Sequence, residues 1–189
     1  MAVGVYPGSF DPPTVAHLAI AEAAVRRCGL ERVDLVLSEE ALGKEHAAHA
    51  RLTDRVEVLR SMAAARPWLG VAVTAARLLV DIADGYDVVV MGADKWAQVC
   101  DPAWYGGSEA ARDDAVRRLP TVAVAPRPGW AVPPGVVALE LDPAHGDISS
   151  TAVRAGTHDW LTSEAATFAA DTGAWIEPER YERWLQARA

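Results

Sequence analysis

The amino-acid sequence predicts an α/β protein with three layers, in which helices cover both faces of a central parallel sheet. Short apolar segments rich in valine alternate with segments in which apolar residues recur at helical spacing, and this alternation is typical of βαβ units. The length of 189 residues fits one compact domain with a buried core. We therefore expect residues 1–189 to form one domain.

The first half of the chain is expected to begin with a strand at residues 3–6, which stops at a Pro-Gly turn. A helix should follow Thr14 and end at Gly29, because apolar residues recur at helical spacing between these positions. Further strands are expected at residues 33–37, 71–73 and 87–91, with helices at 52–65 and 76–83.

The second half continues the alternation. Residues 92–107 are expected to be irregular, and residues 126–135, with four prolines and two glycines, should form a surface loop. The remaining expected elements are a helix at 108–118, strands at 121–125 and 136–141, a helical segment from Ser149 onward and a last helix at 178–187. This order predicts a Rossmann-like α/β/α domain with a helical C-terminal segment.

Composition and charge exclude several classes of protein. The net charge of −8 disfavours a nucleic-acid-binding protein, because such proteins use basic residues to neutralise phosphates. Cys28 and Cys100 stand far apart, which argues against a disulfide framework or a zinc cluster. The sequence has no apolar run of the roughly 18 residues that a membrane helix needs, and its N-terminus does not resemble a secretory signal. We expect a cytoplasmic protein with no nucleic-acid or membrane partner, and the oligomeric state stays open, a homo-oligomer included.

The turn after the first expected strand carries candidate ligands for an anion. In open parallel sheets, ligands bind at the carboxyl ends of the strands, where helix N-termini offer N–H groups. Gly8 allows close approach of the backbone, and Thr14 and His17 lie one helical turn apart on the same face. Both side chains can point at one phosphate, although an ordinary strand-to-helix turn with a polar cap has the same features.

A second polar cluster lies late in the chain. Ser149, Ser150 and Thr151 stand at an expected helix N-terminus, and Arg154 follows one turn later. Hydroxyls, N–H groups and a guanidinium together suit a phosphate clamp. An ordinary N-cap followed by a solvated arginine is the alternative.

The two segments together resemble the nucleotidyltransferase superfamily that carries an H-x-G-H element after the first strand and an I-S-S-T-x-x-R element late in the chain. The resemblance spans nearly the whole length. Residues 6–12, Y-P-G-S-F-D-P, with Thr14 and His17 are similar to phosphopantetheine adenylyltransferases, in which Thr replaces the first His. Later segments look more like nicotinate or nicotinamide mononucleotide adenylyltransferases: G-A-D at 92–94 followed by Trp104-Tyr105, V-A-P-R-P-G at 124–129, and I-S-S-T-A-V-R at 148–154.

This resemblance implies an adenylyltransferase that transfers AMP from ATP to a phosphate-bearing acceptor and releases pyrophosphate. A pyridine mononucleotide, in NAD synthesis, is the first choice of acceptor, and phosphopantetheine, in coenzyme A synthesis, is the alternative. Mg²⁺ should be held mainly by the ATP phosphates, with no protein side chain as its ligand. The implied site residues are His17, Thr14 and Arg154 for catalysis, Gly8, Ser9, Phe10, Gly92, Asp94, Ser149, Ser150 and Thr151 for nucleotide binding, and Lys44 and Trp104 for the acceptor.

Two departures from the family's pattern keep alternatives open. Ala16 replaces the family's glycine between the paired positions, and its methyl group could narrow the nucleotide pocket. A nucleotide-binding protein without turnover is therefore a third hypothesis. Residues 73–77 lack the Y-T-x-x-T pattern of many pyridine mononucleotide enzymes, and R-L-L-V-D at 77–81 is similar to phosphopantetheine adenylyltransferases. The sequence thus leaves open both the acceptor and the preference for ATP over CTP.

Overall fold

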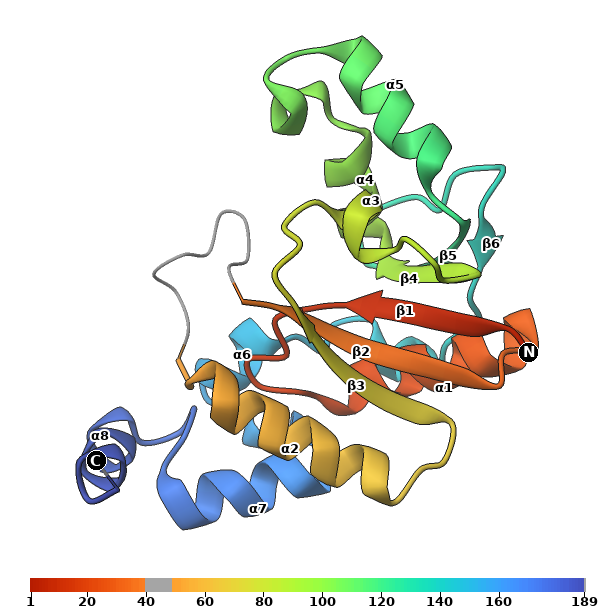
Figure 1. Ribbon diagram of the computed structural model, residues 1–189. Coiled ribbons are helices and arrows are strands. Elements are labelled where there is room, and N and C mark those ends of the chain that lie inside the picture. Colours follow the sequence, from red (N-terminus) through yellow and green to blue (C-terminus); the bar gives the residue numbers. More distant parts are fainter. Residues whose placement is uncertain (40–48, 189) are drawn as a thin grey trace.

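The computed structural model describes residues 1–39 and 49–188 (Figure 1). Its strands form one six-stranded sheet in the order β3-β2-β1-β4-β5-β6, and every neighbouring pair is parallel. The strands are β1 (Val3–Pro7), β2 (Arg32–Ser38), β3 (Leu69–Thr74), β4 (Val88–Gly92), β5 (Thr121–Ala125) and β6 (Val137–Ala138). This is the strand order of doubly wound nucleotide-binding folds, and the direction of winding reverses between β1 and β4.

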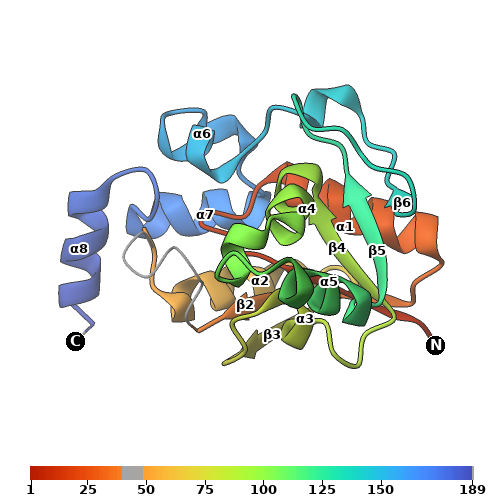
Figure 2. The same cartoon turned by 90° about the horizontal axis from the view of Figure 1, so that it is seen from above.

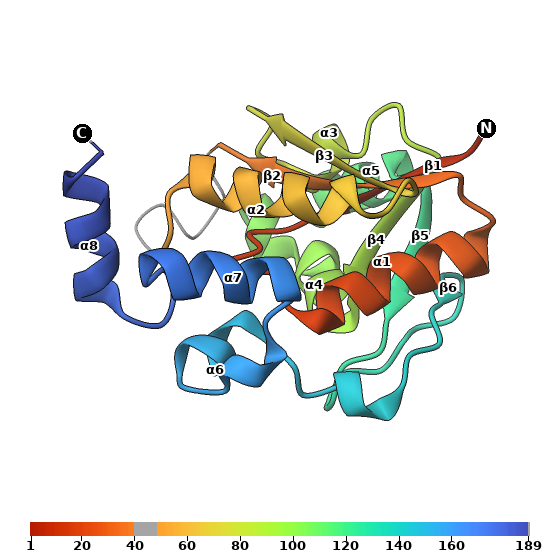
Figure 3. The same ribbon diagram turned by 90° about the horizontal axis from the view of Figure 1, so that it is seen from below.

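Helices cover both faces of the sheet, which confirms the predicted α/β/α architecture (Figures 1 and 2). One face carries α1 (Val15–Cys28) and α2 (Leu52–Ala64), and the opposite face carries α3 (Leu79–Ile82), α4 (Ala93–Cys100) and α5 (Glu109–Arg118). The C-terminal part adds α6 (Ser150–Arg154), α7 (Ser163–Thr172) and α8 (Pro178–Gln186). Figure 3 shows α7 alongside α2, with α8 beyond the end of this pair.

The core is divided by the sheet, because successive side chains of a strand point to opposite faces. Leu35, Leu37 and Val90 pack with α1 and α2 in one buried cluster. Val36 and Val89, their neighbours in the sequence, pack in a second cluster with residues of α3, α4 and α5. Strands buried on both faces are expected to be almost continuously apolar, which is what made the segments recognisable in the sequence.

The prediction that residues 92–107 are irregular is wrong. The helix α4 begins at Ala93, directly after β4, and a 3-10 helix, η1 (Pro102–Tyr105), follows it. The sequence between Ala93 and Pro102 contains no glycine or proline, so nothing in it interrupts a helix. The absence of a loop places the first turn of α4 directly at the carboxyl edge of the sheet.

Three other boundaries moved for identifiable reasons. The helix predicted at 76–83 shrinks to α3 because Ser38 Oγ donates to the Ala76 carbonyl (2.8 Å) and the Ala76 N–H donates to Thr74 Oγ1 (3.1 Å), so the residues before Leu79 stay outside the helix. The strand predicted at 136–141 pairs only at Val137–Ala138, since β5 ends where Pro126 lacks an N–H.

The third boundary is that of β3, which is longer than the predicted residues 71–73 and includes Gly70. A Cβ at Gly70 would lie 1.9 Å from Asp34 Oδ1 on the neighbouring strand. The lack of a side chain at Gly70 therefore leaves space for the buried Asp34 carboxylate, and this glycine does not mark a turn. Asp34 in turn pairs with Arg32 (Nε to Oδ1, 2.8 Å) and accepts a hydrogen bond from Tyr86.

Among the described residues, no helix is long and apolar enough to cross a membrane.

Candidate active site

The candidate site lies at the carboxyl edge of the sheet, where β1 and β4 are neighbours. In folds of this order, the loops that follow these two strands diverge to opposite faces and leave a crevice for a ligand. The loop after β1, residues 8–14, leads into α1, and α4 begins directly after β4. Most of the site residues predicted from the sequence are on these two segments and on α6.

A capping box at the start of α1 joins Thr14 and His17. The His17 N–H donates to Thr14 Oγ1 (3.4 Å), and the Thr14 N–H donates to His17 Nδ1 (3.0 Å). Thr14 Oγ1 also lies 2.9 Å from Nδ1. Because a backbone N–H can only donate, Nδ1 accepts, and the proton of the neutral imidazole is on Nε2. The two side chains share one face of the helix as predicted, with the hydroxyl, which is fully buried, directed at the imidazole.

The imidazole is also supported by aromatic rings. Phe10 is 1% exposed and has a φ of 46°, and its ring centroid lies 5.2 Å from that of His17 and 5.5 Å from that of Tyr6. A Cβ at Gly8 would lie 2.7 Å from Phe10 Cζ. The sequence predicted that Gly8 lets a ligand approach the backbone; in the structure, the group that approaches Gly8 is the ring of Phe10. This ring packs beside His17 and limits its orientation.

The late polar cluster meets the loop after β1. Ser150 Oγ donates to the Pro12 carbonyl (2.7 Å), and Arg154 Nη1 donates to the Asp11 carbonyl. Ser149 caps α6 by accepting from the Ala152 N–H (3.1 Å), as expected. The two segments that carry the family resemblance are thus neighbours in space although more than a hundred residues separate them in the sequence.

The remaining hydroxyl of the cluster, that of Thr151, is exposed and lies 3.3 Å from Arg154 Nη2, which donates to it. The Arg154 guanidinium therefore donates to the loop after β1 through Nη1 and to α6 through Nη2. A guanidinium held at two points in this way has a defined orientation.

A second group of polar residues surrounds Gly92. A Cβ at Gly92 would lie 2.5 Å from Asp94 Oδ1 and 3.4 Å from Arg127 Nε, so the glycine leaves room for both side chains. Arg127 Nη1 donates to the Ile148 carbonyl (2.9 Å), which ties the loop after β5 to the segment before α6. Burial raises the pKa of the Tyr6 hydroxyl strongly, Arg127 partly offsets this, and Asp94 adds to it. These residues therefore share one electrostatic environment at the ends of β1 and β4.

The candidate acceptor residues are placed only in part. Trp104 lies on η1 and is 50% exposed, with Lys95 Nζ 5.9 Å from its ring centroid. Lys95 adjoins Asp94 on the first turn of α4. Lys44 lies outside the described residues.

Ser9, predicted to bind the nucleotide, lies in the loop after β1. Its carbonyl accepts a hydrogen bond from Arg55 Nη1 (2.7 Å).

Sequence reasoning missed the roles of Arg127, Asp11 and Trp175. For Arg127 a signal was present, since a cation directly after a buried parallel strand stands at the ligand-binding edge. The Asp11 carboxylate, 5% exposed, accepts from the Trp175 indole N–H (2.7 Å), and no sequence pattern links positions 164 residues apart. Ala16 is 1% exposed, so its methyl group is covered by the protein and does not face an open pocket.

A resident metal ion needs several close donor side chains. Among the described residues, no three His, Cys, Asp or Glu side chains lie close enough together to hold one. The polar groups on the loop after β1, on α1 and on α6 include hydroxyls, N–H groups, an imidazole and a guanidinium, which suit phosphate oxygens.

Comparisons with known proteins agree with this geometry. The model of the cytidylyltransferase-like family matches residues 5–156. A probable nicotinate-nucleotide adenylyltransferase of Gloeobacter violaceus is 32% identical over 186 residues, which cover 84% of this chain and 86% of the relative. A protein of the same name from Methylorubrum extorquens is 30% identical over 145 residues, 70% of this chain and 73% of the relative. One from Listeria monocytogenes is 38% identical over 60 residues, 32% of each chain.

Proposed function

The chain belongs to the cytidylyltransferase-like family of nucleotidyltransferases, and from this premise we propose that it is an adenylyltransferase acting on ATP and nicotinate mononucleotide. The products would be pyrophosphate and the dinucleotide that leads to NAD. The observation that carries the proposal is the meeting of Ser150 and Arg154 with the loop after β1, one turn before His17. The printed names of the relatives support the acceptor.

The reaction needs no covalent intermediate on the protein. A phosphate oxygen of the acceptor attacks the α-phosphorus of ATP in line, and the bond from this phosphorus to the leaving pyrophosphate breaks. Catalysis then consists of positioning and of neutralising charge that develops on the phosphates. In the proposal, His17 donates from Nε2–H to the α-phosphate region, and Thr14 holds the ring through Nδ1.

The β- and γ-phosphates are assigned to α6. Arg154 and the hydroxyls of Ser149, Ser150 and Thr151 lie on one side of the loop after β1. Mg²⁺ bound to the triphosphate would neutralise part of its charge, and since it prefers to keep several waters, it needs few protein ligands. In the proposal, the backbone of Gly8, Ser9 and Phe10 contacts the nucleotide. Gly92 belongs to the nucleotide site because its lack of a side chain leaves room for Asp94.

The acceptor is assigned to the segment after β4. Asp94 is proposed for a ribose hydroxyl, the exposed indole of Trp104 for stacking on the pyridine ring, and Lys44 for the acceptor phosphate. A cytoplasmic location is part of the proposal, because ATP and the acceptor are metabolites of the cell interior.

The test is pyrophosphate release by the purified protein with ATP and Mg²⁺ and a panel of phosphorylated acceptors, with CTP replacing ATP in a parallel series. The expected result is release with ATP and nicotinate mononucleotide, and less with nicotinamide mononucleotide. Release with phosphopantetheine alone would replace the acceptor by the alternative that the first motif resembles. ATP binding without release for any acceptor would favour a nucleotide-binding protein without turnover.

A further inference from the structure

Asp11 joins three parts of the chain through one buried carboxylate. Its Oδ1 accepts from the Trp175 indole N–H (2.7 Å), and its Oδ2 accepts from the His49 backbone N–H (2.8 Å). The residue is 5% exposed, so neither bond competes much with water. Both donors are far from Asp11 in the sequence, at separations of 164 and 38 residues.

Trp175 is held in an uncommon conformation that directs its indole N–H at Asp11. It is 4% exposed, lies in the turn between α7 and α8, and has a φ of 65°, which is rare for a bulky residue. Its ring packs against Phe168 of α7, with centroids 5.8 Å apart. Such a conformation persists only where the surrounding structure imposes it.

The backbone of the same aspartate carries the candidate phosphate ligand. The Asp11 carbonyl accepts from Arg154 Nη1, and the next carbonyl, that of Pro12, accepts from Ser150 (2.7 Å). Asp11 therefore has Trp175 on its side chain and Arg154 on its main chain. A shift of this residue must move the acceptor that orients the guanidinium.

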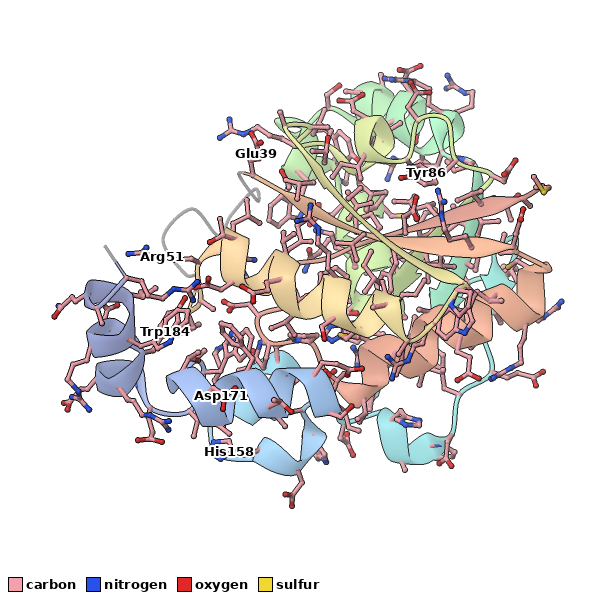
Figure 4. All side chains as sticks on the ribbon, turned by 60° about the horizontal axis from the view of Figure 1, so that its bottom comes forward. Glu39, Arg51, Tyr86, His158, Asp171 and Trp184 are labelled. Atoms are coloured by element: carbon pink, nitrogen blue, oxygen red, sulfur yellow. The ribbon has the colours of Figure 1, made fainter. Side chains whose placement is uncertain are left out.

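Further hydrogen bonds connect this part of the protein to the C-terminal helix α8. The Arg51 N–H donates to the Tyr181 hydroxyl (3.0 Å), and this hydroxyl also bonds to the buried Asp54. Figure 4 shows Arg51 at the start of α2 and Trp184 on the nearby α8. Together with the Trp175 contact, these bonds fix the C-terminal segment to the region around Asp11.

We propose that Asp11, held by the Trp175 indole, is a positioning residue that sets the Arg154 guanidinium for the terminal phosphates of ATP. The inference rests on the proposed function for the identity of the nucleotide. It predicts a specific defect when the tie is cut: the protein should lose affinity for ATP and keep its affinity for AMP, which lacks the phosphates that Arg154 would hold. A purely structural tie would affect both nucleotides alike.

The test measures ATP and AMP binding to Trp175→Phe without an acceptor. This change removes the N–H donor and keeps an aromatic ring. We expect ATP to bind about tenfold more weakly, the scale of one hydrogen bond to a charged group, and AMP to change by less than about twofold. Trp184→Phe is the matched control, because Trp184 contacts the same Phe168 (5.7 Å) while the bond to Asp11 belongs to Trp175. It should keep the wild-type ratio of the two affinities.

Asp11→Asn gives a second, independent arm. The two donors contact different oxygens of Asp11, and an amide in the same position has only one acceptor oxygen, so it keeps the bond from Trp175 or from His49 and faces the other donor with its N–H₂ group. It should lower the ratio of ATP to AMP affinity in the same direction as Trp175→Phe. Equal losses for ATP and AMP, an unchanged ratio, or failure of both variants to fold would each overturn the proposal and leave Asp11 with a structural role only.

The outcomes also separate this inference from the proposed function. A changed ratio in a protein that releases no pyrophosphate with any acceptor would support the positioning role and contradict the proposed reaction. An unchanged ratio in variants of a protein that turns over nicotinate mononucleotide would contradict the positioning role alone.

Discussion

The phosphate side and the acceptor side of the candidate site are built differently. The phosphate side, defined as residues 8–17 and 149–154 with Trp175, is held by hydrogen bonds between residues 138 to 164 positions apart. The side-chain hydrogen bonds of the acceptor side, residues 92–105, join residues close in the sequence: Ala103 N–H to Asp101 Oδ1, Tyr105 O–H to the Val99 carbonyl and Arg112 Nη1 to the Cys100 carbonyl. Trp104 on this side is 50% exposed, whereas Thr14 is fully buried.

This difference matches what each side is proposed to do. Charge stabilisation works best when donors are fixed before the reaction, because they then need not reorganise. Tertiary bonds supply that rigidity on the phosphate side. A locally folded, exposed segment can change its residues with little effect on the rest of the fold, which suits a part that selects the acceptor.

The largest effect is expected from His17→Ala, which removes the central donor of the phosphate side. We expect kcat to fall by roughly 10²-fold or more while ATP affinity changes less, because the imidazole acts mainly on charge that develops in the transition state. Pyrophosphate release under saturating substrates measures this. His158→Ala, at an exposed position on the 3-10 helix η3 (His158–Trp160), is the control, and unchanged turnover in His17→Ala would remove the imidazole from the mechanism.

Arg154→Ala should weaken ATP binding by about 1.5–3 kcal/mol, the scale of hydrogen bonds to a charged group. AMP should be affected less, because it lacks the phosphates assigned to this side chain. Calorimetric titration of both nucleotides gives the comparison, with Arg183→Ala on α8 as a control at an exposed arginine. Equal affinity of the unmodified protein for ATP and AMP would argue against a clamp at this position.

Trp104→Ala tests the acceptor side. If the indole stacks on a pyridine ring, the KM of the pyridine mononucleotide should rise by an amount equivalent to about 1–3 kcal/mol, a scale taken from base stacking on aromatic side chains. The KM of ATP should stay nearly constant, and Trp104→Phe should keep most of the stacking, so that it raises the acceptor's KM little. Trp130→Ala, at a second tryptophan that is 50% exposed, is the control. A rise in the KM of ATP instead would indicate that Trp104 contacts ATP and not the acceptor.

The contrast also explains what the sequence could predict. The order of strands and helices followed from apolar patterning, and the family resemblance linked the segment after β1 with the segment at α6, whose Ser150 and Arg154 donate to the Pro12 and Asp11 carbonyls. The tie from Trp175 to Asp11 could not be predicted, since it depends on how α7 and α8 pack. The strand was predicted only at 71–73, and the sequence does not show that Gly70 lies within β3 to leave space for the Asp34 carboxylate.

The smallest effect is expected from Glu164→Gln. This change tests whether the structure behind the phosphate side can be destabilised without altering substrate binding. Glu164 lies on α7, between Thr162, whose N–H reaches the Pro13 carbonyl, and Trp175. Its carboxylate pairs with Arg66, which follows α2 (Oε1 to Nη1, 2.8 Å), with side chains 15% and 23% exposed. The change should lower the free energy of unfolding by about 1 kcal/mol at pH 7 and leave both KM values unchanged.

The pH dependence of this effect has a definite sign. Burial by itself raises the pKa of the Glu164 carboxyl, but its hydrogen bonds with Arg66, its own backbone N–H and Ser163, together with the charge of Arg66, lower the pKa below its usual range. A carboxyl with a lowered pKa in the folded state adds stability above its unfolded pKa and loses it as the pH falls through the folded value. Urea unfolding from pH 7 down into the acid range should therefore show the difference between wild type and Glu164→Gln shrinking below about pH 4. Glu179→Gln, at an exposed position on α8, should show no such trend. A difference that stays constant with pH, or a changed KM, would mean that Glu164 acts by packing or by positioning and not through its charge.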